Sequence, residues 1–299
     1  MKTNKKTRGF LLAMALFSCF GLTQCTKSEM DDDFNIGDPP PVAGGFTNSS
    51  QIQQENLVAY FPFDGNITDT KGGVTGGVAT GNPTFVPGVK GQSYQGNTNA
   101  FAVYANPGPV AALTSFTVSF WVNTQKHDGG AQGIFSLGKQ DGSFWGNFFT
   151  IIEGNNSPNN KMQVKLHFEK NTVPNVEQWV APSDAVWPND MYGAWRQITY
   201  TYDETTSKVA YYANGTAINL GADADRKSGV GSDPLGALAF KNATKFVIGG
   251  FQNHAGPPFN GLESWMLSYT GKLDEMRIYK KALTAQEVSA LFILEKQGR

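Results

Sequence analysis

The sequence predicts an all-β fold, an antiparallel β-sandwich with a short C-terminal helix. Residues 115–122 give the clearest strand, because every second residue from Phe116 to Val122 is apolar and alternate residues of a strand share a face. The composition agrees, since charged residues make up only 16% of the chain and glycine occurs 34 times, as is typical of many strands joined by tight turns. Near the end, Thr284 and Glu287 match a capping box ahead of apolar residues at helical spacing, which predicts the helix.

Residues 1–25 have the pattern of an export signal. Basic residues open the chain and an apolar run of 13 residues follows at 10–22, shorter than the roughly 20 residues that span a bilayer. The end of this segment resembles a bacterial lipoprotein signal, in which a cysteine is acylated and becomes the new N-terminus. Cys25 is the favoured anchor, because cleavage at Cys19 would leave apolar residues beside the membrane and an odd thiol. Cys19 is the alternative, since the small Ser18 precedes it, and cleavage without lipid is a third.

Residues 26–54 predict a flexible stalk. Aspartates cluster at 31–33, prolines at 39–41 and small polar residues at 49–51, and such a segment buries too little apolar surface to offset the entropy of ordering it. Its acidic start resembles the tethers that direct Bacteroidetes-type lipoproteins to the cell surface. The resemblance implies an exported protein, lipid-anchored to the outer membrane and facing the cell surface, with no transmembrane helix in the mature chain.

Charge and cysteine content exclude some classes of function. The formal net charge falls from −1 to about −5 once the basic residues of the signal are removed, which argues against nucleic acid as a partner, because phosphate binding needs clustered lysine and arginine. At most one of the two cysteines remains after processing, so no intrachain disulfide is expected. Residues 55–295 are numerous enough to bury a core and fit a single sandwich.

Six segments stand in the order of the core strands of laminin-G-like domains. They lie at 57–65, 115–122, 195–203, 209–218, 246–250 and 271–279. Residues 55–295 therefore resemble a laminin-G-like domain of the concanavalin A-like lectin/glucanase superfamily. The resemblance implies a jelly roll whose first and last strands pair in one sheet. It does not select a function, because this fold hosts lectins, adhesion modules, glycosidases and lyases.

No catalytic residue is predicted. Superfamily members that cut β-glucans carry carboxylates at alternate positions of one strand, which places them on one face. In this chain Asp274 and Glu275 are adjacent, as are Asp203 and Glu204, so each pair is expected on opposite faces of an extended strand. Zinc-protease and serine-hydrolase motifs are also absent from the sequence. A divergent glycosidase or lyase is the alternative.

The resemblance also implies a structural calcium ion. In related sandwiches such an ion often ties the first and last strands together, and Asp64, Asp69 and Asp274 are the candidate ligands, since Ca²⁺ takes six to eight oxygens. The alternative is that Asp64 caps the turn that follows it, and that Asp274 or Glu275 pairs with a neighbouring basic residue such as Arg277.

Aromatic residues in loop-like segments are the candidates for ligand binding. Sugar recognition in such folds uses exposed aromatic planes beside amides and carboxylates. The tryptophans in segments rich in glycine, proline and asparagine are Trp145, Trp179, Trp187 and Trp265, and the polar residues expected beside them are Asn147, Asp190, Asn253 and His254. Each tryptophan is also explained by packing, because the indole is large and often half-buried. Trp121 and Trp195 fall in core-strand motifs and are expected to be structural.

These features favour a surface-anchored, non-catalytic lipoprotein that binds carbohydrate or another surface ligand through the loops of a β-sandwich. Its partners would be a glycan and the lipid of the outer membrane, with calcium as the one possible cofactor. Two other hypotheses stand beside it: a divergent polysaccharide-degrading enzyme, and a protein-binding adhesion or scaffold module.

Overall fold

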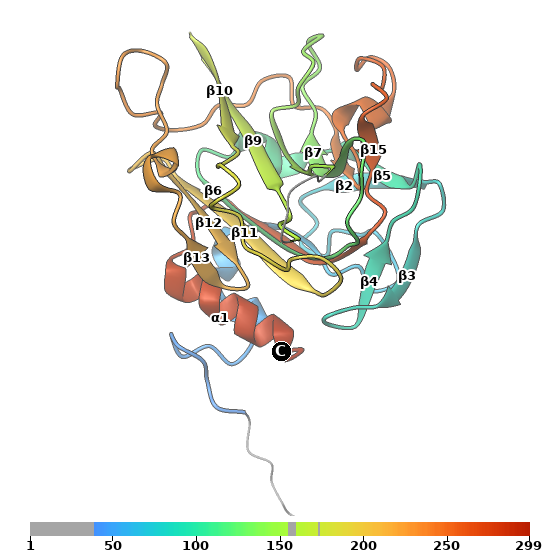
Figure 1. Ribbon diagram of the computed structural model, residues 1–299, viewed down its shortest axis with the longest axis vertical. Coiled ribbons are helices and arrows are strands. Elements are labelled where there is room, and N and C mark those ends of the chain that lie inside the picture. The colour runs from blue at the N-terminus through green and yellow to red at the C-terminus, as the bar shows by residue number, and fades with distance from the viewer. Residues whose placement is uncertain (1–38, 155–159, 173) are drawn as a thin grey trace, which may run out of the picture. The chain divides into compact units, whose positions relative to one another are not determined.

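Two antiparallel β-sheets pack face to face and enclose the core. A computed structural model describes residues 39–154, 160–172 and 174–299 of the chain. Within these residues each sheet has eight strands. Figure 1 shows three layers, with sheet B above sheet A and the helix α1 (Ala285–Lys296) beneath sheet A.

Sheet A has the order β13-β12-β11-β6-β16-β4-β3, and β1 also pairs with β16. Its strands are β1 (Leu57–Phe61), β3 (Thr84–Pro87), β4 (Gln92–Gln95), β6 (Phe116–Asn123), β11 (Arg196–Asp203), β12 (Lys208–Ala213), β13 (Thr216–Ile218) and β16 (Lys272–Tyr279).

Sheet B has the order β10-β9-β8-β7-β14-β5-β2, and β15 pairs parallel to β7. Its strands are β2 (Thr75–Thr80), β5 (Phe101–Asn106), β7 (Ala131–Leu137), β8 (Phe148–Ile152), β9 (Val164–Asn171), β10 (Asn175–Val180), β14 (Phe246–Ile248) and β15 (Met266–Ser268). Short 3₁₀ turns at Gly108–Ala112, Gly221–Ala224 and Gln252–Ala255 lie in the connections.

The first and last strands pair, as the resemblance implied. β1 lies antiparallel to β16, with Phe61 opposite Met276, and β6 lies on the other side of β16. The alternating apolar residues of β6 are buried in the core, and Phe61 and Phe135 both stack on Phe246 at centroid distances of 6.0 and 5.8 Å. The β-sandwich prediction is confirmed.

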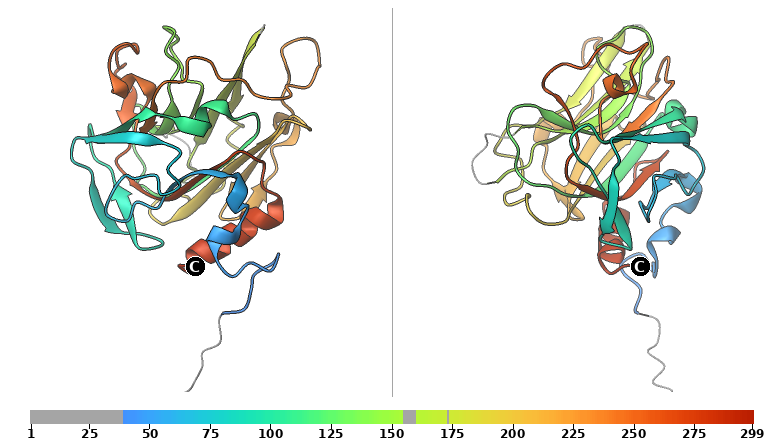
Figure 2. Two further views of the ribbon diagram at one scale, coloured as in Figure 1. Left: turned by 180° about the vertical axis from the view of Figure 1, so that it is seen from behind. Right: turned by 90° about the vertical axis from the view of Figure 1, so that its right-hand side faces the viewer.

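The folded domain begins earlier than residue 55. Ser49–Gln51 and Gln54–Asn56 form 3₁₀ turns, Ile52 is buried, and Phe46 packs on the same apolar cluster, to which α1 also contributes. The Ser49 hydroxyl donates to the carbonyl of Arg299 at 2.7 Å. The stalk predicted at 26–54 is therefore too long at its C-terminal end, because a few widely spaced apolar residues find a surface beside α1. Both views in Figure 2 show this segment, in blue, next to the helix.

The helix begins at the predicted capping box. The backbone N–H of Glu287 donates to the Thr284 hydroxyl at 3.2 Å, and the Glu287 carboxylate accepts from the Thr284 N–H at 2.8 Å. Its inner face buries Val288 and Leu291 against Tyr279 of β16. Such reciprocal caps satisfy donors that have no partner within the helix.

β16 carries a bulge at Asp274 and Glu275. The register against β6 shifts there, and Glu275 has a left-handed backbone with φ 47°. A bulge inserts one extra residue into a strand, so Leu273 and Met276 both reach the core. The expectation that the two adjacent acids point to opposite faces of the sheet is therefore wrong here: both lie outside the core.

Residues 1–38 lie outside the described part of the chain, and with them the predicted signal, Cys19 and Cys25. Within the described residues, no helix is long and apolar enough to cross a membrane.

Candidate functional site

A row of rings crosses the outer face of sheet B. Phe149 on β8 lies opposite His167 on β9, and His167 lies opposite Trp179 on β10. The ring centroids are 4.6 Å apart for Phe149 and His167 and 4.7 Å apart for His167 and Trp179. Leu166 and Phe168, the neighbours of His167, face the core, so strand alternation puts the row on the opposite face.

Two loop tryptophans complete a continuous aromatic surface. Trp145, just before β8, has its ring centroid 5.3 Å from that of Trp179 and 5.7 Å from that of Trp265, just before β15. Phe144 packs edge-on to Trp145 and is 38% exposed. We call these four residues, the half-buried Trp145, Trp179 and Trp265 and the exposed Phe144, the aromatic surface.

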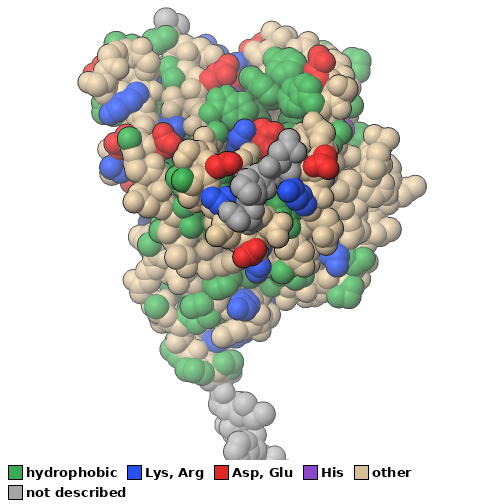
Figure 3. Space-filling view, viewed as in Figure 1, with side chains coloured by type: hydrophobic (Ala, Val, Ile, Leu, Met, Phe, Trp, Pro, Cys, Tyr) green, Lys and Arg blue, Asp and Glu red, His purple; other side chains and the backbone are tan. Residues whose placement is uncertain are grey.

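Buried apolar side chains pack beneath the aromatic surface and fix the positions of its rings. Trp145 stacks on Phe149, and Trp265 lies edge-on to Phe251, with Met266 in the same apolar cluster. Figure 3 shows hydrophobic side chains gathered near β7 on one face of the molecule, with acidic side chains at their border. Contiguous apolar patches with a polar rim mark interaction sites on soluble proteins.

A buried imidazole lies beneath the tryptophans. His167 is fully buried, and neither of its ring nitrogens has a hydrogen-bond partner among the described residues. The Glu177 carboxylate stands 3.7 Å from its Nε2 atom, which is too long for a hydrogen bond. An unsatisfied buried polar group costs about 1–3 kcal/mol. Because the His167 ring has no exposed surface, it supports the tryptophans from within the row and does not itself meet a ligand.

Polar side chains continue along the same face of the sheet. Lys165, two residues before His167, pairs with Glu153 at 2.9 Å, and both are partly exposed. Together with Glu177 they place donors and acceptors beside the tryptophans. The arrangement suits a ligand with one apolar face and several hydroxyl groups.

Asn253 and His254 position the loop that carries Trp265. The Asn253 amide donates to two carbonyls of residues 260 and 261, each at 3.2 Å. The Nδ1 atom of His254 accepts from the Phe251 N–H at 3.0 Å, and its ring lies 4.9 Å from that of Phe101. Burial lowers the pKa of His254 to about 4. It is therefore neutral near pH 7, with its proton on Nε2.

Three predicted site residues lie elsewhere. Trp187 is only 2% exposed and packs on Tyr211 in the main core, so it cannot stack on a ligand. Asn147 is buried and donates to two backbone carbonyls, at 3.0 and 2.9 Å. Asp190 is exposed, but its carbonyl accepts from Arg196 at the start of β11, in sheet A.

The carboxylates of Asp64 and Asp274 hold the same turn between β3 and β4. Asp274 accepts from the N–H groups of Val89 and Lys90, at 2.6 and 3.2 Å. Asp64 accepts from the N–H of Gln92 at 2.7 Å. The two end segments thus meet through hydrogen bonds to one hairpin.

Asp69 has a similar role in another loop. It accepts from the backbone N–H groups of Tyr60, Lys71 and Val74, at 2.8, 2.9 and 2.7 Å. In the described part of the chain no three histidine, cysteine or acidic side chains form a group that could hold a metal ion. The three predicted carboxylates therefore do not fit a shared calcium site, which needs six to eight oxygens around one point.

The second acid of the bulge belongs to a buried ion cluster under α1. Arg277, which is 1% exposed, donates to Glu275 at 2.8 Å and to Glu295 of α1 at 2.7 Å. Trp121 donates its indole N–H to Glu295 at 2.7 Å, and Tyr60 donates its hydroxyl to Glu275 at 2.7 Å. Burial raises the pKa of Glu295 to about 7 although Arg277 opposes the shift.

Sequence reasoning missed part of the aromatic surface. Trp179 was expected in a loop and lies on β10. Phe144, Phe149 and His167 were not expected at all. The alternation in 164–169, with apolar residues at 164, 166 and 168 and polar ones between, would have placed His167 on a second, non-core face.

Comparison with known proteins agrees with this architecture. The family model described as "Concanavalin A-like lectin/glucanases superfamily" (Laminin_G_3) matches residues 95–289. No curated protein matches the chain.

Solved structures of related fold include ligand-binding domains. One is domain 4 of AbnA, an extracellular GH43 arabinanase from Geobacillus stearothermophilus, in complex with arabinotriose; the TM-score is 0.51 at 18% identity, over 79% of this chain and 98% of that one. The receptor-binding domain of botulinum neurotoxin type G gives 0.51 at 15% identity, over 80% and 51%. A structure of botulinum neurotoxin type C, whose cell entry depends upon interaction with two ganglioside molecules, gives 0.53 at 12% identity, over 82% and 52%. The chain thus spans about half of the toxin structures, and identities this low show a shared fold alone.

Proposed function

Because this chain belongs to the concanavalin A-like lectin/glucanases superfamily, we propose that it is a non-catalytic carbohydrate-binding protein and that the aromatic surface of sheet B is its binding site. The convergence of Trp145, Trp179 and Trp265, with ring centroids 5.3 and 5.7 Å apart, carries the proposal. Sugar rings have C–H faces that stack on indoles, and tryptophan combines a large apolar area with a polar edge.

The polar groups around the tryptophans support the same ligand class. Glu177, Glu153 and Lys165 are partly exposed and stand beside the tryptophans on the same sheet face. A sugar hydroxyl can donate to one of these groups and accept from another. A purely apolar ligand would leave all of them unused.

The related structures add support at the level of ligand class. The arabinanase domain was solved with arabinotriose, and cell entry of the type C toxin depends upon gangliosides, which carry sugars. We further propose that the protein is displayed at the cell surface by a lipid on Cys25 or Cys19. Mass spectrometry of the mature N-terminus tests this display: an unmodified first residue other than cysteine would refute it.

The acids of the closing strand are committed to the fold, which supports binding without cleavage. Asp274 accepts three backbone N–H groups, and Glu275 is paired with Arg277. Neither carboxylate is free to act as general acid or nucleophile on a sugar.

The test is a glycan array followed by titration calorimetry with the best oligosaccharide, with arabinotriose as the first soluble probe. We expect the W179A and W265A substitutions each to weaken binding by about tenfold, since loss of an aromatic anchor costs roughly 1–2 kcal/mol. W195A is the matched control, because Trp195 is also half-buried but lies just before β11, an inner strand of the other sheet.

Three outcomes would contradict the proposal. Binding that survives W145A, W179A and W265A together would remove the aromatic surface as the site. Release of reducing sugar from a bound glycan, lost in E177Q, would make the protein an enzyme. A protein partner captured equally well with and without free sugar would make it an adhesion module.

A further inference from the structure

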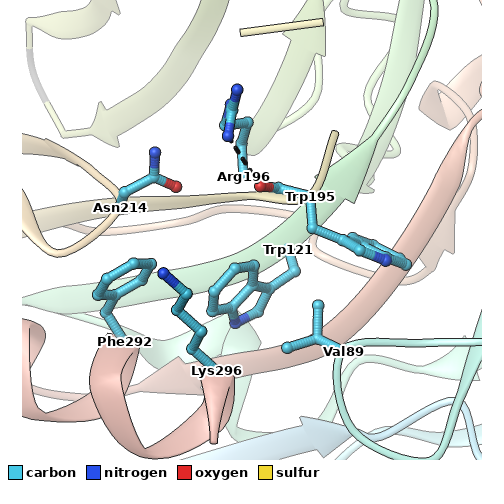
Figure 4. A pocket seen from close by; sticks show the side chains of 7 residues that line it. All are labelled: Val89, Trp121, Trp195, Arg196, Asn214, Phe292 and Lys296. Atoms are coloured by element: carbon cyan, nitrogen blue, oxygen red, sulfur yellow. Dashed lines mark hydrogen bonds between the residues drawn. The ribbon is translucent and has the colours of Figure 1, made fainter. Parts of the chain in front are cut away.

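A pocket lies on the opposite side of the sandwich from the aromatic surface, where α1 crosses the outer face of sheet A. Its volume is about 290 Å³, near the lower bound of roughly 300 Å³ for small-molecule sites, so it suits a single ring. Trp195 beside β11 and Phe292 of α1, both half-buried, supply its aromatic walls, the buried Trp121 of β6 forms its floor, and Val89 lines it as well. Figure 4 shows Phe292 on one side of Trp121, and Trp195 and Val89 on the other.

The floor of the pocket is rigid and apolar. The Trp121 ring stacks on Phe292, with centroids 5.3 Å apart and planes at 18°. Its indole N–H is already donated to the buried Glu295, so Trp121 supports Phe292 from below and gives the pocket no hydrogen-bond donor. Glu295 itself accepts from three side chains, Trp121, Gln197 and Arg277, and does not line the pocket.

The charged residues that line the pocket are all cations. Arg196 and Lys296 line it, and no aspartate or glutamate does. Among the described residues neither cation has a carboxylate within ion-pair distance. The Lys296 ammonium stands 5.5 Å from the Phe292 ring centroid, and in the view of Figure 4 it lies between the rings of Phe292 and Trp121. Arg196 is directed toward the Asp190 carbonyl and adds positive charge at the edge.

We infer that this pocket binds a hexuronic acid residue, a sugar ring that bears one carboxylate. The aromatic walls match the C–H face of the ring, and Lys296 supplies a cation for the carboxylate. A neutral hexose could stack on the aromatic walls but could not form the ion pair. Inorganic phosphate could form the ion pair but has no ring to stack. The site is separate from the aromatic surface, because it lies on sheet A and shares no residue with it.

The experiment titrates the protein with glucuronate and galacturonate at low salt, with glucose and galactose as neutral probes, and follows tryptophan fluorescence or NMR shifts. We expect a Kd of about 1 mM for a uronate, as for other small ligands of this size, and binding at least about tenfold weaker for the neutral sugars. Added sodium chloride should weaken uronate binding, since exposed charges are screened.

Variants assign the effect to the pocket. K296Q should weaken uronate binding about fivefold, the effect of removing one exposed charge partner, and K296E should abolish it. W195A should also abolish it while leaving binding at the aromatic surface unchanged. K227Q is the control for a lost lysine, because Lys227 is exposed and does not line the pocket, and W265A should leave uronate binding intact.

Lys296 is exposed at the end of α1, so K296E should fold normally, which a thermal melt checks. Uronate binding that K296E leaves unchanged, equal affinity for uronate and hexose, or no uronate binding at concentrations well above the expected Kd would each overturn the inference. The uronate site does not depend on the aromatic surface, so a failure of that surface to bind neutral glycans would refute only the proposed function.

Discussion

Substitution of Arg277 by methionine, R277M, should destabilise the domain by about 4 kcal/mol, because loss of one partner from a buried ion pair costs roughly 3–5 kcal/mol. The guanidinium is 1% exposed and lies 2.8 Å from Glu275 and 2.7 Å from Glu295. Methionine is also unbranched and adaptable, so most of the loss should come from two buried carboxylates left without a cation rather than from a cavity.

The domain should remain folded but melt earlier. Domains of this size lose about 2–4 °C in Tm per kcal/mol, which gives a decrease of about 8–16 °C. Urea unfolding followed by tryptophan fluorescence measures the free energy directly. The matched control is K208M, which breaks the exposed pair of Lys208 and Asp225, 61% and 47% exposed, and should leave the free energy of unfolding almost unchanged.

The pH dependence of R277M provides a second check. Burial raises the pKa of Glu295 to about 7 in the presence of Arg277, and loss of the cation should raise it further. The unpaired carboxylate should then be protonated at pH 5, so the deficit should be smaller at pH 5 than at pH 8. A second substitution, E295Q, should recover part of the loss. An R277M effect no larger than that of K208M would refute the reasoning.

Three further predictions concern the acids and glycines of the loops. Burial, with Glu275 adding to it, raises the pKa of Asp274 from 3.8 to about 8, so the folded state favours the protonated form. The free energy of unfolding should therefore fall as pH rises between these two values, and urea titrations should find a flatter slope in D274N. A wild-type protein without this slope would contradict the raised pKa. In G91A the new Cβ would lie 2.0 Å from Oδ1 of Asp64, at a backbone φ of +62°. Urea unfolding should therefore show a loss of free energy of unfolding well above the roughly 1–2 kcal/mol that left-handed strain alone costs. The control is G72A, at φ +78° with nothing within 4 Å of the new Cβ, which should cost only the strain. EDTA should leave Tm unchanged, and D69A should lower Tm equally with and without EDTA, because the Asp69 carboxylate accepts hydrogen bonds from backbone N–H groups and does not bind a metal. A fall in Tm of several degrees on adding EDTA would instead support calcium as a cofactor.

The architecture could be predicted from the sequence because its signals are local. Alternation in 115–122 and the capping box at Thr284 depend on residues within a few positions of one another. The bulge at Glu275 could not be predicted, because it follows from the left-handed backbone of one residue. The bulge places the Glu275 carboxylate on the side of the sheet away from the core, while the apolar residues on either side of it still face the core.

The site could be predicted only in part. Trp145 and Trp187 stand in similar loop-like segments, yet one joins the aromatic surface and the other packs on Tyr211 in the core. The two tryptophans differ in the distant segment against which each one packs, and a single sequence does not show such long-range contacts. The same reason explains why the apolar residues near Ile52 were assigned to the stalk: their partners lie on α1, more than 200 residues away.

The docking of the N-terminal segment beside α1 has a mechanical consequence. The chain enters the sandwich at Phe46 and Ser49, on the side of sheet A, whereas the tryptophans lie on the outer face of sheet B. A protein held by its N-terminus would turn the tryptophans away from the point of attachment. Tension on a captured polymer would then cross both sheets and load the contacts of Ser49 with Arg299 and Arg277. How long such a capture lasts under flow would depend on the strength of these contacts as well as on affinity.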